Sequence, residues 1–162
     1  PFNIAFKADG QSDLSKDFIA YIMSAEGQTI INEHGYVGSN DAAAYEANGA
    51  EGKLVVGGSS SVSPIMEKLI EAYKAVNPKA DIELQTTDST TGMTAAIDGT
   101  YDIGMASREL KDDEAAALSH QAIAMDGIAV IVNQANPTDE LSVEQIGSIF
   151  TGELTKWNEI VK

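Results

Sequence analysis

Apolar positions along this chain follow two patterns, short apolar runs typical of strands and the four-residue steps of a helix. The predicted strands cover residues 2–6, 53–56, 82–86, 102–106, 122–123 and 128–132. Steps such as Leu14, Phe18 and Ile22 predict a first helix that begins near Ser12 or Asp13. The other predicted helices cover 25–34, ending at Gly35, and then 64–76, 91–98, 112–119 and 143–150. This alternation predicts a three-layer α/β/α fold with a mostly parallel sheet.

Both patterns stop between Gly38 and Gly52, where small and acidic residues dominate. Such a composition predicts a linker over 38–52, because it offers few side chains to a core. The linker would join a first segment, 1–37, to a second one, 53–133. Residues 134–162 would follow as a helical extension.

The run from Gly57 to Pro64 joins a predicted strand to a predicted helix and consists mainly of glycine and serine. Glycine lets the backbone turn tightly, and the hydroxyls of Ser59, Ser60 and Ser61 can donate hydrogen bonds. The free N–H groups of the first helical turn point the same way, towards the positive end of the helix dipole. The run therefore predicts a cradle for an oxyanion such as phosphate.

Two further loops have the same character. The loop that carries Asp88, Ser89 and Thr90 again leads from a strand into a helix, and a third strand ends at Ser107 and Arg108, the only arginine in the chain. In an open α/β sheet, ligands bind beyond the carboxyl ends of the strands, where these loops would converge. Taken singly, each residue has a structural alternative: the serines and Asp88 as helix caps, and Arg108 as the partner of a carboxylate.

Composition narrows the classes of partner. The 162 residues carry a formal net charge of −15, which argues against nucleic acid and anionic membranes as partners. This charge does not exclude phosphate, because exposed charges are screened within about 10 Å. The chain has no cysteine, as expected of an exported protein that avoids thiols, and no signal peptide, so export would make it a mature or excised piece.

Catalysis and metal binding have little support in the sequence. There is no Gly-x-Ser-x-Gly elbow and no Walker A lysine, and the two histidines, His34 and His120, lie at predicted helix ends. No His, Asp and Glu cluster has the spacing of metal ligands. We therefore expect a binding protein with no cofactor and no metal, rather than an enzyme.

Five motifs between 53 and 162 stand in the order and spacing seen in phosphate-binding proteins of bacterial phosphate ABC importers, which the chain resembles. They begin at Gly58, Asp88, Asp102, Asp126 and Ile149. Residues 1–37 resemble the C-terminal end of that family, at Pro1–Phe2, 15–19, 24–28 and 33–37. The resemblance implies a class II periplasmic-binding-protein fold in circularly permuted order, formed by one lobe whose two ends are joined through 38–52.

The resemblance also implies roles for single residues. Ser60 and Ser61 match positions that give phosphate a hydroxyl and a backbone N–H, and Ser89 matches the donor of the second loop. Ser107 stands where some members have an aspartate that accepts the proton of the bound anion. We expect Asp126, rather than Asp88, to supply that acceptor, with Ser59, Thr90 and Arg108 as further site residues.

The resemblance finally implies partners and a place of action. The partners are inorganic phosphate, a second lobe that closes over the ligand, and an ABC permease, and the protein itself would act outside the cell, at the cell surface or in the periplasm. One alternative is a folded lobe that binds nothing well alone and dimerises through its open cleft face. A second alternative is a site for another oxyanion, such as sulfate or molybdate. The last helix, 143–150, would lie beyond the hinge and could belong to the other lobe.

Overall fold

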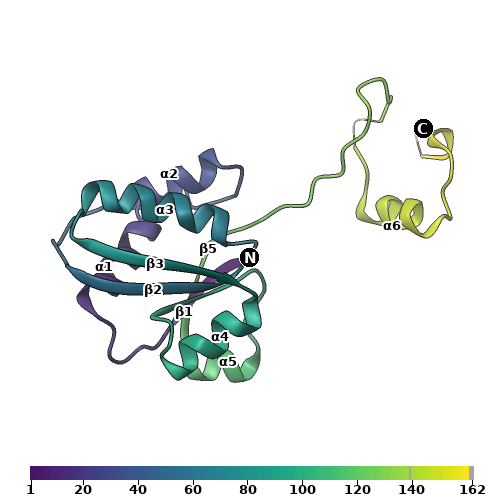
Figure 1. Ribbon diagram of the computed structural model, residues 1–162. Helices are drawn as coiled ribbons and strands as arrows, with labels where there is room; N and C mark the ends of the chain where they lie inside the picture. Colours follow the sequence, from purple (N-terminus) through teal and green to yellow (C-terminus); the bar gives the residue numbers. More distant parts are fainter. Residues whose placement is uncertain (139, 161–162) are drawn as a thin grey trace. The chain divides into compact units, whose positions relative to one another are not determined.

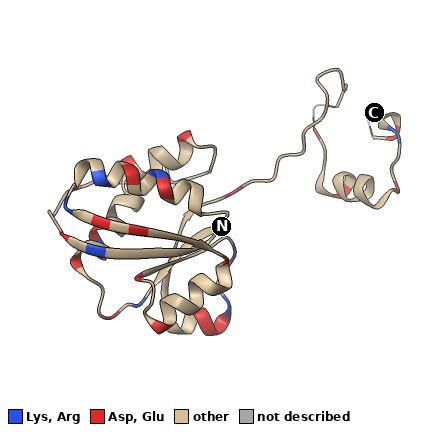
Figure 2. Cartoon of the chain, in the orientation of Figure 1, with Lys and Arg blue, Asp and Glu red and all other residues tan. Residues whose placement is uncertain are grey.

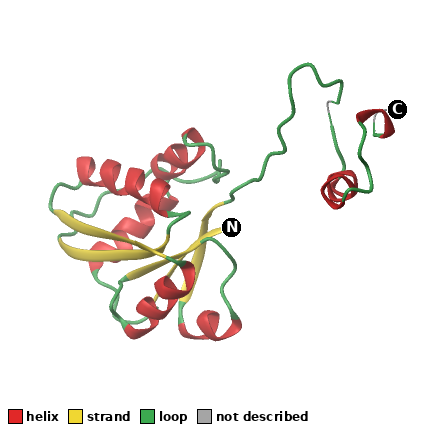
Figure 3. Cartoon of the chain, turned by 45° about the vertical axis from the view of Figure 1, so that its right-hand side comes forward, coloured by secondary structure: helices red, strands yellow, loops and turns green. Residues whose placement is uncertain are grey.

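The computed structural model describes residues 1–138 and 140–160 and divides the chain into two compact units (Figure 1). The first unit spans Pro1–Gly127 and the second spans Ile128–Lys162. The first unit contains a sheet between helices, whereas the described residues of the second form short helices and loops (Figure 3).

The first unit is built on a five-stranded sheet with the order β3-β2-β4-β1-β5. Strand β2 pairs in parallel with β3 and β4, and β1 pairs in antiparallel with β4 and β5. Four strands therefore run in one direction and only β1 runs against them, which confirms the prediction of a mostly parallel sheet. The strands are β1 (Phe2–Phe6), β2 (Gly52–Ser59), β3 (Ala80–Thr87), β4 (Ile103–Ala106) and β5 (Ser119–Ala124).

Helices cover both faces of this sheet, as predicted. On one face lie α1 (Asp13–Met23), α2 (Ala25–Glu33) and α3 (Ser63–Val76). On the other face lie α4 (Ser89–Asp98) and α5 (Asp112–Ala117) (Figure 1). The larger core lies between the sheet and the first three helices and includes Phe18, Leu69 and Tyr73, all fully buried.

Local sequence signals fix where the helices begin and end. The Ser12 hydroxyl accepts a hydrogen bond from the Ser15 N–H and caps α1, close to where the sequence predicts its start. Gly35, at φ +85°, follows α2 in the left-handed conformation that glycine adopts without steric cost. These signals are local, which explains why the sequence alone predicts them.

Two glycines let α4 approach the sheet closely. A side chain at Gly58 would collide with the Met105 carbonyl, and one at Gly92 would come within 2.7 Å of the Gly58 Cα. No larger residue fits at either position without moving the backbone. The close approach brings the N-terminus of α4 up to the ends of β2 and β4.

Residues 38–51 form no helix and no strand, but hydrogen bonds tie them to the helices of the first unit. Val37 forms an isolated bridge with Met125, and the Ala25 N–H donates to the Ala43 carbonyl at 2.7 Å. The Tyr45 hydroxyl donates to the buried Asp17 carboxylate at 2.6 Å. Tyr73 donates to the same Asp17 oxygen at 2.7 Å. The 38–51 segment is therefore anchored onto α1, α2 and α3.

The second unit contains helix α6 (Val143–Thr151) and the short 3-10 helix η1 (Trp157–Glu159). The predicted strand over 128–132 is wrong, since those residues form no strand, and Ile128 and Ile131 are 99% and 90% exposed. A strand needs a neighbour to complete its hydrogen bonds, and the described part of this unit has no other strand. No helix within the described residues is long and apolar enough to cross a membrane.

Candidate anion-binding site

Three serine side chains from three different elements meet at the carboxyl edge of the parallel strands. Ser59 ends β2, Ser89 opens α4 and Ser107 follows β4. The Ser59 hydroxyl donates to the Ser107 Oγ at 3.0 Å, and the Ser89 and Ser107 hydroxyl oxygens are 3.4 Å apart. The Ser107 N–H also donates to the Ser89 Oγ at 3.1 Å. Ser59 is buried, Ser89 is half-buried and Ser107 is exposed, so the cluster is open to solvent on one side.

Ser60 and Ser61 lie in the exposed turn between β2 and α3. The Ser60 N–H donates to the Thr87 carbonyl at 3.0 Å, which ties this turn to the end of β3 and leaves only the Ser60 hydroxyl for a ligand. The Ser61 N–H and hydroxyl have no hydrogen-bond partner among the described residues. The turn thus offers two hydroxyls and one backbone N–H at the same sheet edge as the serine cluster.

The carboxylate of Asp88 caps the N-terminus of α4. It accepts the Thr90 N–H at 2.9 Å, the Thr91 N–H at 3.0 Å and the Thr91 hydroxyl at 2.6 Å. The hydrogen bond from the Thr91 hydroxyl, together with the backbone bonds, holds the pKa of Asp88 below its usual value. Asp88 is therefore a poor proton acceptor for a ligand. The Thr90 hydroxyl stays exposed beside it.

Arg108 is held by a carboxylate that the sequence analysis did not identify. Its guanidinium makes a two-pronged ion pair with Glu114, with N–O distances of 2.7 and 2.8 Å. Glu114 is buried, and its pKa is lowered, chiefly by the hydrogen bonds from Arg108. The pair raises the pKa of Arg108 in turn. The weaker contact of Arg108 with the Thr90 hydroxyl, at 3.5 Å, places the ion pair beside the loop that opens α4.

Asp126 lies two residues beyond β5, on the same sheet edge as the ends of β2 and β4. It is exposed and makes no side-chain hydrogen bond or ion pair with the described residues. Strand β1 separates β5 from β4, so the first unit does not bring Asp126 into the serine cluster. The structure thus assembles Ser59, Ser89 and Ser107 directly and leaves the proton acceptor unassigned.

The chemistry of this edge is that of a neutral hydrogen-bonding site. The cluster hydroxyls bond to one another, and none bonds to a histidine or a carboxylate within the described residues, so no base activates them as nucleophiles. No group of three or more His, Cys, Asp or Glu side chains could hold a metal ion in the described part of the chain. Hydroxyls whose O–H groups are not tied to a charged acceptor can turn to donate to an incoming oxyanion.

Acidic side chains outnumber basic ones, 25 to 10, and Figure 2 shows the acidic positions spread over many helices, strands and loops of the chain. Asp88 is the acidic side chain that caps the adjoining helix, and three hydrogen bonds partly offset its charge. The overall charge of −15 therefore does not prevent an anion from binding at this edge.

Residues 43–161 match the PBP superfamily domain. The chain is also 49% identical, over its whole length, to the phosphate-binding protein PstS 2 of Streptococcus agalactiae serotype V, of which it covers 56%. It spans about half the length of the curated relatives that it matches.

Two solved structures are similar to the chain. A phosphate-binding protein of a phosphate ABC transporter from Streptococcus pneumoniae TIGR4 superposes with a TM-score of 0.90 at 42% identity, covering 99% of this chain and 63% of that protein. A substrate-binding protein assigned to phosphate ABC transport, from Clostridium perfringens and with bound phosphate, gives a TM-score of 0.53 at 42% identity. That match covers 67% of this chain and 45% of that protein.

Proposed function

This chain belongs to the PBP superfamily, and on that premise we propose that it supplies one half of a phosphate site in a solute-binding protein. The protein would serve an ABC-type phosphate importer, deliver its ligand to the permease, and act outside the cell, at the cell surface or in the periplasm. Support comes from relatives that are named as phosphate-binding proteins and from a similar structure that holds phosphate. The chain itself would do no catalysis.

The convergence of Ser59, Ser89 and Ser107 is the observation that carries this proposal. The Ser107 hydroxyl oxygen lies 3.0 Å from that of Ser59 and 3.4 Å from that of Ser89, so hydroxyls from three separate elements meet at a single sheet edge. Independent helix caps would have no reason to meet in this way. The N-terminus of α4 lies at the same edge and favours negative charge there.

Binding would replace the bonds between these hydroxyls with bonds to phosphate oxygens. Ser89 and Ser107 would turn their O–H groups towards the anion, while the Ser60 hydroxyl and the Ser61 N–H would donate from the neighbouring turn. Hydrogen bonds to a charged acceptor are roughly twice as strong as neutral ones, so the exchange favours the ligand. Arg108 would act from a distance, since Glu114 already neutralises it.

Ser107 gives the proposed site a particular selectivity problem. A hydroxyl can accept the proton of a monohydrogen phosphate or donate to a fully ionised sulfate, whereas a carboxylate would reject sulfate. Asp126 is our candidate for the missing acceptor, because its exposed carboxylate is free of other bonds within the described residues. A second lobe would have to bring the ligand and Asp126 together.

We also propose that the chain is a permuted lobe, with 1–37 completing the unit formed by 53–133 and with 134–162 belonging beyond the hinge. The S. agalactiae relative aligns with the whole of this chain, whereas the C. perfringens structure aligns with 67% of it. This difference supports a segment order that only some relatives share. The exposed side chains of Val143 and Phe150 support packing of α6 against the proposed second lobe.

Calorimetric titration of phosphate into the chain at neutral pH tests the proposal. We expect saturable binding that weakens about tenfold in Ser107→Ala, because one hydrogen bond to a charged group is lost. Ser119→Ala, which removes an exposed hydroxyl from β5, is the matched control and should bind phosphate as the unchanged chain does.

Three results would count against this function. Equal heats for sulfate or molybdate would favour a general oxyanion site. No heat at millimolar phosphate would favour a lobe that binds only when complete. A concentration-dependent dimer in a native mass spectrum, together with no phosphate heat, would favour the dimerising lobe.

A further inference from the structure

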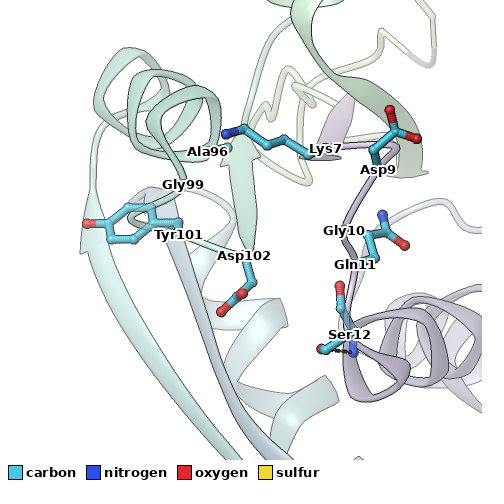
Figure 4. Close-up of a pocket in the computed structure, with 10 residues that line it drawn as sticks. Lys7, Asp9, Gly10, Gln11, Ser12, Ala96, Gly99, Tyr101 and Asp102 are labelled. Carbon is cyan, nitrogen blue, oxygen red and sulfur yellow. Dashed lines mark hydrogen bonds between the residues drawn. The ribbon is translucent and has the colours of Figure 1, made fainter.

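A pocket lies at the edge of the sheet opposite to the serine cluster, where β1 ends, β4 begins and α1 starts (Figure 4). Its volume is about 160 Å³. This is several times the roughly 30 Å³ that a water molecule occupies in the liquid, so the pocket has room for a small organic molecule. The side chains that matter most are Lys7, Asp9, Gln11, Ser15, Tyr101 and Asp102.

This pocket gathers buried polar atoms that have no partner. Among the described residues, three buried side-chain polar atoms lack a hydrogen bond, and two of them, the Gln11 Nε2 and the Ser15 Oγ, belong to residues that line this pocket. Ser15 is only 1% exposed. Buried polar groups in folded proteins are nearly always bonded, because a buried donor or acceptor without a partner loses its hydration and gains nothing in return. The two atoms therefore point to a bound partner.

The start of α1 adds a preference for negative charge on the same wall. The Ser12 hydroxyl caps only the Ser15 N–H, at 3.1 Å, so the earlier N–H groups of this 11-residue helix stay available. They carry the positive end of the helix dipole, which favours a carboxylate or a similar anion. The Gln11 amide and the Ser15 hydroxyl can donate to the same anion.

The other wall carries charged groups that lack ion-pair partners. Figure 4 shows Asp102 facing the Gln11 and Ser12 side across the pocket, with Lys7 and Asp9 near one end. Asp102 is held in place because one of its oxygens accepts the Val55 N–H at 2.7 Å. Lys7, Asp9 and Asp102 form no ion pair within the described part of the chain. This wall can accept a cation at Asp102 while the α1 side accepts an anion.

We propose that this pocket binds a small zwitterion of the amino-acid type, with its carboxylate at the start of α1 and its ammonium group at Asp102. A simple anion would be repelled by Asp9 and Asp102, and a simple cation would leave the Gln11 and Ser15 groups unmet. A neutral polyol would leave both kinds of charge unpaired. The site is separate from the proposed phosphate site and does not depend on it.

Titration of the full chain with glycine, followed by proton–nitrogen correlation NMR, tests this proposal. We expect saturable shifts centred on the Gln11 side-chain amide and on the Asp13 and Leu14 amides. Acetate and methylamine, which carry one charge each, should bind more weakly than glycine. Ser15→Ala and Asp102→Asn should each weaken glycine binding about tenfold, because each removes a contact to a charged group.

The two proposed sites provide controls for each other. Ser60→Ala, at the opposite sheet edge, should leave the glycine titration unchanged, and Ser15→Ala should leave the phosphate titration unchanged. If Asp102→Asn disturbs the fold, Ser15→Ala still tests the site, because it removes only one buried oxygen. Saturation by glycerol but not by glycine would overturn the zwitterion in favour of a polyol. No saturable shift up to about 50 mM glycine would mean that the pocket holds only solvent.

Discussion

Two segments of this chain, 38–51 and 128–132, form neither helix nor strand. The more polar of the two is packed against the core, whereas the apolar one is exposed. The 38–51 segment consists mainly of small and acidic residues, and the hydrogen bond from Tyr45 to Asp17 anchors it to the core. Residues 128–132 are Ile, Ala, Val, Ile and Val, and they are exposed, with Ile131 at 90%. Apolar composition alone did not decide which segment is packed.

The difference lies in what each segment can contact. The ring of Tyr45 packs against Tyr21 at a centroid distance of 5.1 Å, and its hydroxyl donates a hydrogen bond to Asp17. Residues 128–132 find no neighbouring strand within the described part of their unit. A single well-placed aromatic residue anchors a polar segment, whereas a strand-forming run stays unpaired until a second edge is supplied.

The largest effect should come from removing the acceptor beneath the anchored segment. In Asp17→Ala, the hydroxyls of Tyr45 and Tyr73 both lose their charged partner inside the core. We expect the free energy of unfolding to fall by about 3 kcal/mol, measured by urea denaturation of the first unit. Glu67→Ala, which changes an exposed carboxylate on α3, should change it by less than about 0.5 kcal/mol. Equal losses in the two variants would show that the anchor contributes nothing.

A smaller effect should come from the tyrosine of the segment itself. Tyr45→Phe removes one of the two hydroxyls at Asp17 and keeps the ring contact with Tyr21, so we expect a loss of about 1–2 kcal/mol at neutral pH. Tyr73 still satisfies the Asp17 carboxylate in this variant.

The same contacts should make the first unit sensitive to alkaline pH. Burial, followed by the hydrogen bond to Asp17, raises the pKa of Tyr73 to about 12 and raises that of Tyr45 further still. A raised folded-state pKa gives stability that is complete below the ordinary tyrosine pKa of about 10 and is lost as the pH rises through about 12. Denaturation midpoints from pH 8 to 12 should fall less steeply in Tyr45→Phe than in the unchanged chain. Parallel curves would contradict the assignment.

The smallest effect should come from the exposed apolar run. Ile131→Asn should change the free energy of unfolding of the first unit by less than about 0.5 kcal/mol, since the side chain is 90% exposed. Ile31→Ala, at a fully buried isoleucine in α2, should cost about 2–5 kcal/mol in the same assay. A loss above about 1.5 kcal/mol in Ile131→Asn would mean that this run is packed when the chain is in solution.

Part of the anion site could be predicted from the sequence, and part of it depends on contacts between residues that local patterns do not reveal. The convergence of Ser59, Ser89 and Ser107 follows from the parallel strand direction, which the alternating pattern predicts, and from the neighbouring positions of β2 and β4, which only the structure gives. The ion pair of Arg108 with Glu114 had only a weak signal, an acidic first turn in the helix that follows Arg108. Whether a carboxylate turns inwards to an arginine or outwards to water depends on packing that spacing does not encode.

The sequence by itself determined the elements that depend on neighbours along the chain: nearly all the helices and strands, the caps at Ser12 and Gly35, and the place of the serine-rich loops at strand ends. Periodicity and capping act over a few residues, so one sequence is enough to predict them. The tertiary structure alone decided which loops are anchored, which carboxylate holds Arg108, and where unpartnered donors line a pocket. Those outcomes depend on contacts between residues far apart in sequence, whose energies are set by burial and geometry that no local pattern contains.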